Sequence, residues 1–231
     1  MKTFAGRTRA VVALLFLATC GLAAQAQAPQ PASHDFARWE KDIAAFEAAD
    51  KVSPLPKNAI LFVGSSTIVR WKTLRNDFPA FPIINRGFGG NQIADSTHFA
   101  DRMIIPYQPR TIFLRAGGND IHSGKTPEQV LADFKAFVAT VHAKLPATEI
   151  VFISLSPSIA RWDERAANRK LNALVADFVN RTPRLKYIET YDISLDKAGQ
   201  PRPELFVEDK LHFSPEGYKL LIERVRPYVR K

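Results

Sequence analysis

Ala59-Ile60-Leu61-Phe62-Val63-Gly64 runs directly into Ser65-Ser66-Thr67, and this junction decides the fold class of the chain. An unbroken apolar run of this length is typical of a parallel strand that is buried on both faces. A glycine turn into a helix then places a small polar side chain at the edge of the sheet. The start of such a helix also offers free backbone N–H groups to an anion.

Four further runs of the same kind follow along the chain. They are Pro82–Asn85, Thr111–Ala116, Glu149–Leu155 and Leu185–Thr190. Helical patterns separate the runs, so strands alternate with helices. This alternation predicts an α/β fold, a three-layer α/β/α sandwich around a five-stranded parallel sheet with right-handed crossovers.

The predicted helices carry start signals. The clearest begins at Thr126-Pro127-Glu128-Gln129, where the threonine can cap the helix and the glutamine can reach back to it. Other helical patterns start at Ser33, extend from about Glu164 to Val179, and start at Ser214-Pro215. The sequence shows no internal repeat and no sign of a second domain.

The first residues have the three-part pattern of a secretory signal peptide. A basic start precedes the apolar run Val11–Ala18, which is too short to span a bilayer, and Ala24-Gln25-Ala26 is the best cleavage site. We therefore predict a signal peptide over residues 1–26, a short tether over 27–32 and one domain over 33–231. The protein is expected to be exported, either to the periplasm or out of the cell.

The single cysteine, Cys20, precedes this cleavage site, so the mature chain is predicted to have no disulfide. Leu17-Ala18-Thr19-Cys20 also resembles a lipobox, which makes a lipid anchor on Cys20 a minority alternative. Thr19 fits that motif poorly.

Charge gives little indication of a macromolecular partner. The formal net charge is +9, and three of these charges lie in the predicted signal peptide, which leaves +6 for the mature chain. No Lys/Arg run and no interleaving of basic and aromatic residues is present, which argues against nucleic acid as a partner. No transmembrane segment is predicted in the mature chain. A solvated basic surface is the favoured interpretation of the charge, with an anionic envelope surface or an acidic substrate as the alternatives.

Three strand ends carry residues that suit chemistry, although each has a plainer interpretation. Ser66 follows the first run, and serine is an ordinary helix cap. The glycine-rich stretch Asn85–Asn91 follows the second run, and a tight turn would explain it equally well. Asn119 follows the third run, where it could donate to a developing oxyanion or form an Asx turn.

Asp209 and His212 precede the last predicted helix. A carboxylate and an imidazole three residues apart can share one turn, so that Asp209 holds one ring nitrogen and the other is left for proton transfer. Metal ligation would need further ligands nearby, and none is clustered here, so no metal site is predicted. His122 follows the third strand end closely and is expected to be a surface loop histidine.

Four sequence blocks thus follow one another along the chain: Ser66, the stretch Asn85–Asn91, Asn119 and the pair Asp209 and His212. Their order resembles that of the SGNH, or GDSL, family of esterases and lipases (acylhydrolases), and the resemblance extends from about Ala59 to Tyr218. The resemblance implies a flavodoxin-like sandwich and a Ser66 nucleophile. Gly64-Ser65-Ser66 stands where the family has Gly-Asp-Ser, so Ser65 departs from the family pattern at a position that affects local hydrogen bonding rather than the triad.

The resemblance also assigns the remaining roles. Asp209 and His212 complete a catalytic triad with Ser66, and an oxyanion hole is formed by the backbone N–H groups of Ser66 and Gly90 with the Asn119 side chain. No cofactor is needed for this chemistry.

The function implied is that of a serine ester hydrolase that removes a small acyl or acetyl group from a carbohydrate or lipid. Acyl transfer to a sugar hydroxyl and a non-catalytic binding module of the same fold are the alternatives. Near the strand ends, four side chains could contact an acidic or sugar leaving group, although for each a surface or packing role is the favoured interpretation. They are Arg86, Arg115, Arg161 and Trp162.

Overall fold

The five apolar runs form one parallel sheet in the computed structural model, which describes Met1 and residues 34–230. The strands are β1 (Ile60–Gly64), β2 (Ile83–Gly87), β3 (Thr111–Arg115), β4 (Glu149–Ile153) and β5 (Leu185–Ile188). Their order across the sheet is β2-β1-β3-β4-β5, and each adjacent pair is parallel. This is the flavodoxin-like order, so the predicted fold class is confirmed.

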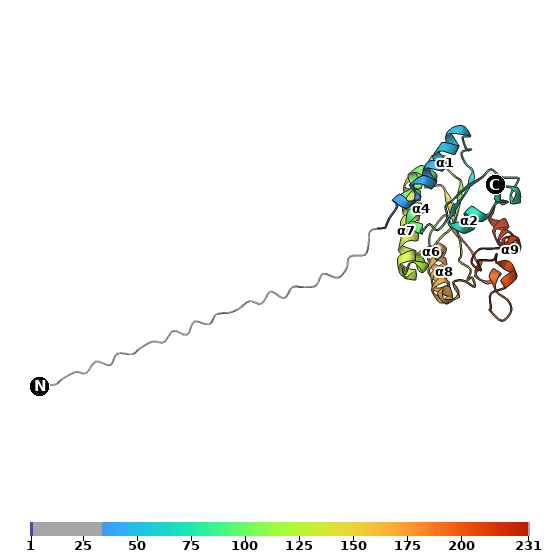
Figure 1. Cartoon of the computed structure of the whole chain (residues 1–231). Helices are drawn as coiled ribbons and strands as arrows, with labels where there is room; N and C mark the ends of the chain where they lie inside the picture. The colour runs from blue at the N-terminus through green and yellow to red at the C-terminus, as the bar shows by residue number, and fades with distance from the viewer. Residues whose placement is uncertain (2–33, 231) are drawn as a thin grey trace. The chain divides into compact units, whose positions relative to one another are not determined.

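Helices cover both faces of the sheet (Figure 1). The α-helices are α1 (Glu40–Val52), α2 (Ser66–Arg70), α3 (Leu74–Asp77), α4 (Ile93–His98), α5 (Ala100–Met103), α6 (Gly118–His122), α7 (Pro127–Lys144), α8 (Arg165–Asn180) and α9 (Pro215–Val225). Short 3-10 turns include η1 (Ala37–Trp39), η3 (Trp162–Glu164) and η5 (Pro203–Leu205).

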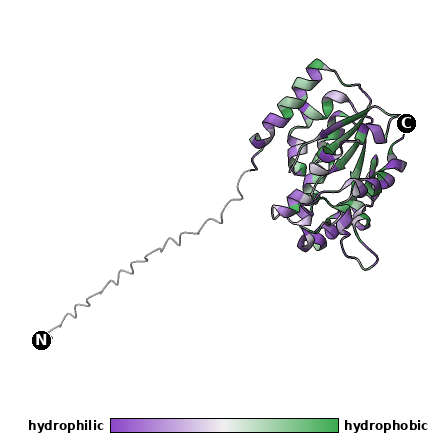
Figure 2. Cartoon of the chain, turned by 45° about the vertical axis from the view of Figure 1, so that its right-hand side comes forward, coloured by the Kyte–Doolittle hydropathy of each residue, from purple (hydrophilic) through white to green (hydrophobic). Residues whose placement is uncertain are grey.

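Alternation along the strands assigns each side chain to one of two cores. Leu61 and Val63 of β1 face a core that includes residues of α1, α4, α7 and α8. Ile60 and Phe62 face the opposite core, which includes residues of α2, α3 and α9. All four side chains are fully buried, which explains why the run is apolar without interruption. Figure 2 shows hydrophobic residues concentrated along the strands.

Two predicted helix starts are confirmed. Thr126 and Gln129 form a reciprocal capping box at α7, and the Ser214 hydroxyl accepts a hydrogen bond from the Gly217 amide at α9. The first helix differs from the prediction, because regular α-helix begins only at Glu40. The residues before it are anchored by packing, since the Trp39 ring lies edge-on to Phe88, at 5.4 Å between centroids.

The molecule divides into a unit over Asp35–Lys231, which carries every helix and strand of the described residues, and a separate unit over Met1–His34. The predicted signal peptide and tether, together with Cys20 and Ser33, lie outside the described residues apart from Met1. Among the residues that are described, no helix is long and apolar enough to cross a membrane.

The strand order places β1 between β2 and β3. Connections from β1 and β3 therefore diverge to opposite sides, which opens a crevice at the carboxyl ends of these strands. Ser66, Gly90 and Asn119 follow the carboxyl ends of β1, β2 and β3 respectively.

Candidate active site

Ser66 is the first residue of α2, and Gly64 allows the chain to reach it. Gly64 has φ of +148°, and a Cβ there would lie 2.2 Å from the carbonyl oxygen of Arg115. Only glycine fits this close approach of the β1 and β3 ends. The turn that follows is held by the Ser65 amide, which donates to the same Arg115 oxygen at 3.2 Å.

His212 lies between Ser66 and Asp209. Its Nε2 is 2.9 Å from Ser66 Oγ, and its Nδ1 is 2.6 Å from Asp209 Oδ2. The distances permit a chain of two hydrogen bonds in which the carboxylate fixes the Nδ1–H tautomer and Nε2 accepts from the hydroxyl. Residues separated by 146 positions are thus brought into direct contact.

Asp209 also builds the turn that carries His212. Its Oδ1 accepts from the backbone amides of Leu211 at 3.0 Å and His212 at 2.9 Å, and Lys210 between them has φ of +56°. Desolvation of the carboxyl opposes ionisation, but the hydrogen bonds from His212 and Leu211 outweigh it and hold the pKa of Asp209 well below its ordinary value. The carboxylate is therefore ionised throughout the neutral range.

Asn119 has a defined amide orientation. Its Nδ2 donates to the carbonyl oxygen of Asn91 at 3.0 Å, and its Oδ1 accepts from Nη1 of Arg161 at 3.1 Å. One of the two N–H bonds of the amide is used in this way, which leaves the second for a ligand. Asn119 lines the same pocket as Ser66 and Gly90.

Gly90 is packed against Trp39, the last residue of η1. It has φ of +81°, and a Cβ at this position would come within 3.3 Å of the Trp39 ring. The Trp39 ring thus packs against the loop that follows β2. Because η1 and α1 precede the first strand, this support comes from a part of the chain that the four sequence blocks did not include.

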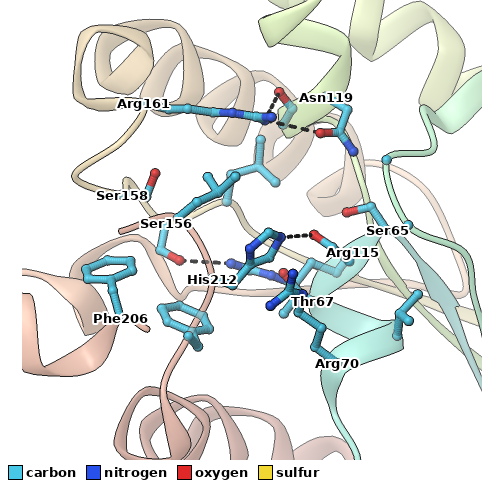
Figure 3. A pocket seen from close by; sticks show the side chains of 18 of the residues that line it. Ser65, Thr67, Arg70, Arg115, Asn119, Ser156, Ser158, Arg161, Phe206 and His212 are labelled. Carbon is cyan, nitrogen blue, oxygen red and sulfur yellow. Dashed lines mark hydrogen bonds between the residues drawn. The ribbon is translucent and has the colours of Figure 1, made fainter. Parts of the chain in front are cut away.

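Together these residues surround a pocket of about 420 Å³ (Figure 3). Ser66, Gly90, Asn119 and His212 line it, and Asp209 lies behind His212. The structure therefore brings all the predicted site residues to one edge of the sheet. Further polar lining comes from nine side chains: Ser65, Thr67, Arg70, Arg115, Ser156, Ser158, Arg161, Glu164 and Asn168.

The favoured surface interpretation is wrong for Arg86 and Arg115, whose exposed fractions are 6% and 5%. Arg86 forms an ion pair with Asp50 and donates to Tyr107, because α1 lies over it, and it does not line the pocket. Arg115 does line the pocket. Its position inside the apolar run Thr111–Ala116 was the sequence signal for burial.

The segment after β4 supplies pocket residues that the sequence did not identify as a group. Arg161, Glu164 and Asn168 lie on or beside η3 and the first turn of α8, at nearly helical spacing. Such spacing is common on solvated helices, so it gave no distinct signal. His122 is a surface side chain as expected, although it is the last residue of α6 and not part of a loop, and its Nδ1 lies 2.6 Å from Glu164 Oε1.

Asp120 is a buried carboxyl next to Asn119. It accepts from the Ile93 amide and from Lys125 Nζ, at 3.3 Å and 3.2 Å. Burial raises its pKa to about 6, although Lys125 acts in the opposite direction. No group of three or more His, Cys, Asp and Glu side chains that could hold a metal is found among the described residues.

Comparison with protein families gives one match, to the GDSL-like lipase/acylhydrolase family over residues 63–220. The matched segment contains Ser66, Asn119 and the Asp209–His212 turn. No match was found among curated proteins.

Solved structures with the same architecture include a protein from Streptococcus pneumonia, provisionally described as a platelet activating factor. It is 26% identical, with a TM-score of 0.72 over 83% of this chain and 92% of that one. A GDSL-like lipase from Bacteroides thetaiotaomicron has 16% identity and a TM-score of 0.65, covering 84% and 96% of the two chains.

A variant of an acetyl-xylooligosaccharide esterase from Geobacillus stearothermophilus has 15% identity and a TM-score of 0.61, covering 77% and 97%. At such identities the last two similarities concern the fold alone.

Proposed function

This chain belongs to the GDSL-like lipase/acylhydrolase family and is a carboxylic ester hydrolase, and from that premise we propose that Ser66 is its nucleophile. The observation that carries the proposal is the contact of 2.9 Å between Ser66 Oγ and His212 Nε2, in a pocket that both residues line. Asp209 and His212 complete the triad in this proposal.

In the first half of the reaction, His212 Nε2 takes the hydroxyl proton as Ser66 Oγ forms a bond to the ester carbonyl carbon. Negative charge develops on the carbonyl oxygen, where the amides of Ser66 and Gly90 and the free N–H of Asn119 can donate to it. The bond to the alcohol oxygen then breaks, and His212 returns the proton to that oxygen. An acyl-serine remains.

Water completes the cycle. It loses a proton to His212 Nε2 as it attacks the acyl-serine, and the proton passes back to Ser66 Oγ when the acid leaves. Asp209 keeps the imidazole in the required tautomer and stabilises the imidazolium that forms in each half. A carbohydrate hydroxyl in place of water would give acyl transfer instead.

We propose a small acyl group, such as acetyl, on a carbohydrate or lipid alcohol as the substrate. The pocket volume of about 420 Å³ suits a compact ester, and its serine, asparagine and arginine lining suits a polar alcohol. One protein of the same fold is an acetyl-xylooligosaccharide esterase, which makes acetylated carbohydrates the first natural esters to test.

Export is part of the proposal and rests on the N-terminal sequence pattern. The mass of the protein recovered from the periplasm or medium tests it. Loss of residues 1–26 is expected; an unprocessed N-terminus contradicts cleavage, and a diacylglycerol on Cys20 favours the lipobox alternative.

Turnover of p-nitrophenyl acetate tests the assignment of Ser66. The Ser66→Ala variant is expected to lose nearly all turnover while keeping the circular dichroism spectrum of the wild type. Ser53→Ala, at the exposed end of α1, serves as the matched serine control and is expected to keep full activity. Equal rates for Ser66→Ala and wild type would refute the assignment.

A further inference from the structure

The pocket wall is rich in arginine. Arg70 comes from α2, Arg115 from the end of β3 and Arg161 from the segment before η3, and all three line the cavity. In Figure 3, Arg161 lies above His212 and Arg70 below it. Glu164 is the one carboxylate among the pocket-lining residues that the structure describes.

Arg115 is a buried cation with neutral partners. Its Nη1 donates to Thr190 Oγ1 at 3.1 Å and to the Ser154 carbonyl oxygen, and its Nη2 donates to Ser156 Oγ at 2.8 Å. Within the described part of the chain no carboxylate pairs with it. Burial lowers the pKa of Arg115 to about 10, so the guanidinium still carries its charge at neutral pH.

Arg161 also has neutral acceptors, the Asn119 Oδ1 atom at 3.1 Å and the Gly118 carbonyl oxygen at 3.4 Å. Arg70 differs, since its Nη1 lies 3.8 Å from Asp209 Oδ2. The charges of Arg70 and Asp209 therefore offset each other. The Glu164 carboxylate lies in the same lining and its Oε1 contacts His122 Nδ1 at 2.6 Å, so the charges of Arg115, Arg161 and Glu164 sum to +1.

We propose that the substrate ester carries a single negative charge, as a carboxylate or a phosphodiester, which binds beside Arg115 and Arg161. This inference rests on the proposed function of the pocket and narrows its substrate class. Delocalised oxyanions match guanidinium donors in geometry and form charge-assisted hydrogen bonds with them. The hydroxyls of Ser156 and Ser158 on the same wall can add neutral donors.

Three acetate esters with related phenol leaving groups test the proposal. They are 4-acetoxybenzoate, 4-acetoxyphenyl methyl phosphate and the neutral 4-acetoxybenzamide. After correction for their rates of hydroxide hydrolysis, kcat/KM is expected to favour at least one anionic ester by about tenfold or more. The preferred anion distinguishes a carboxylate substrate from a phosphodiester. Equal values, or a preference for the neutral ester, would overturn the proposal.

Two arginine variants test whether the preference for anionic esters depends on Arg161. Arg161→Gln is expected to reduce the anionic-to-neutral ratio of kcat/KM several-fold, whatever its effect on the neutral ester alone. Arg165→Gln is the matched control, because Arg165 is exposed, donates to the Trp162 carbonyl oxygen and lies outside the pocket lining. It is expected to keep the wild-type ratio. An unchanged ratio in Arg161→Gln would remove Arg161 from the anion site.

Failure of this inference is distinguishable from failure of the proposed function. If Ser66→Ala is inactive but charge in the ester makes no difference, only the anionic substrate class is wrong. If Ser66→Ala remains fully active, the pocket is not the reaction site and both are wrong.

Discussion

Asn119 can present its amide in two ways, and Arg161 selects one of them. A guanidinium can only donate, so its contact of 3.1 Å requires the amide oxygen on that side and directs the nitrogen toward Asn91 and the pocket. Besides the proposed contact with the anionic group of the substrate, Arg161 is a positioning residue, because it orients Asn119.

Asn119→Ala is expected to lower kcat on a neutral ester by about 10²–10³-fold with little change in KM, since the donor is needed mainly in the transition state. Steady-state kinetics with p-nitrophenyl acetate measures both constants. A rise in KM at unchanged kcat would instead place Asn119 in ground-state binding.

A double-mutant cycle tests the role of Arg161. Arg161→Gln is expected to lower kcat in the wild-type background and to have little further effect in Asn119→Ala, because the side chain that it orients is then absent. Arg161→Lys keeps a donor and should recover part of the loss. Additive losses in the double variant would show that the two residues act independently.

The sequence predicted Ser66, Gly90, Asn119, Asp209 and His212 as site residues, because the blocks that contain them occur in the order of the family that the chain resembles. It did not identify Arg161 as a partner of Asn119, since the two are separated by 42 positions and no block includes both. Contacts of this kind depend on how the segment before η3 lies against α6, which periodicity does not encode.

At the scale of elements, the junction of β1 with α2 depends on Gly64. Gly64→Ala is expected to destabilise the protein by more than about 3 kcal/mol, because the new Cβ would collide with the Arg115 carbonyl and φ is positive. Urea unfolding followed by circular dichroism measures the change. Gly118→Ala is the control, since its Cβ would meet open space. Similar stability of both variants would contradict the steric argument.

The packing of α6 against α4 includes the buried carboxylate of Asp120, which is bonded to the Ile93 amide. Its pKa is raised from 3.8 to about 6 by burial, so the folded protein binds more protons than the unfolded chain between about pH 4 and 6. The contribution of Asp120 to stability is therefore fully present below this window and is lost as the pH rises through it.

Asp120→Asn removes this titration. The free energy of unfolding of the wild type, relative to Asp120→Asn, is expected to fall by on the order of 2 kcal/mol from pH 4 to pH 7. Urea titrations at several pH values measure this difference. A difference that stays constant, or one that grows as the pH rises, would contradict the raised pKa.

At the scale of the whole molecule, the five apolar runs predicted the five strands and their parallel arrangement. They did so because strands buried on both faces need apolar side chains at every position. The order β2-β1-β3-β4-β5 followed only from the family resemblance, since apolar runs do not specify which strands are neighbours.

Charged residues at the ends of the runs were harder to interpret. Arg86 is buried because α1 covers it, and Arg115 is buried because the strand ends enclose it. Both guanidinium groups donate hydrogen bonds to partners that are distant in the sequence. Those partners lie 21 and 41 positions away, so local sequence could not reveal them.

The central claim is that Ser66 is the nucleophile, and covalent labelling tests it most directly. Intact mass after reaction with a fluorophosphonate, followed by peptide mapping, is predicted to give one adduct on Ser66 in the wild type. The same adduct is predicted on Ser66 in Ser65→Ala, whereas Ser66→Ala should remain unlabelled. An adduct on Ser65, or labelling of Ser66→Ala at the wild-type rate, would contradict the account.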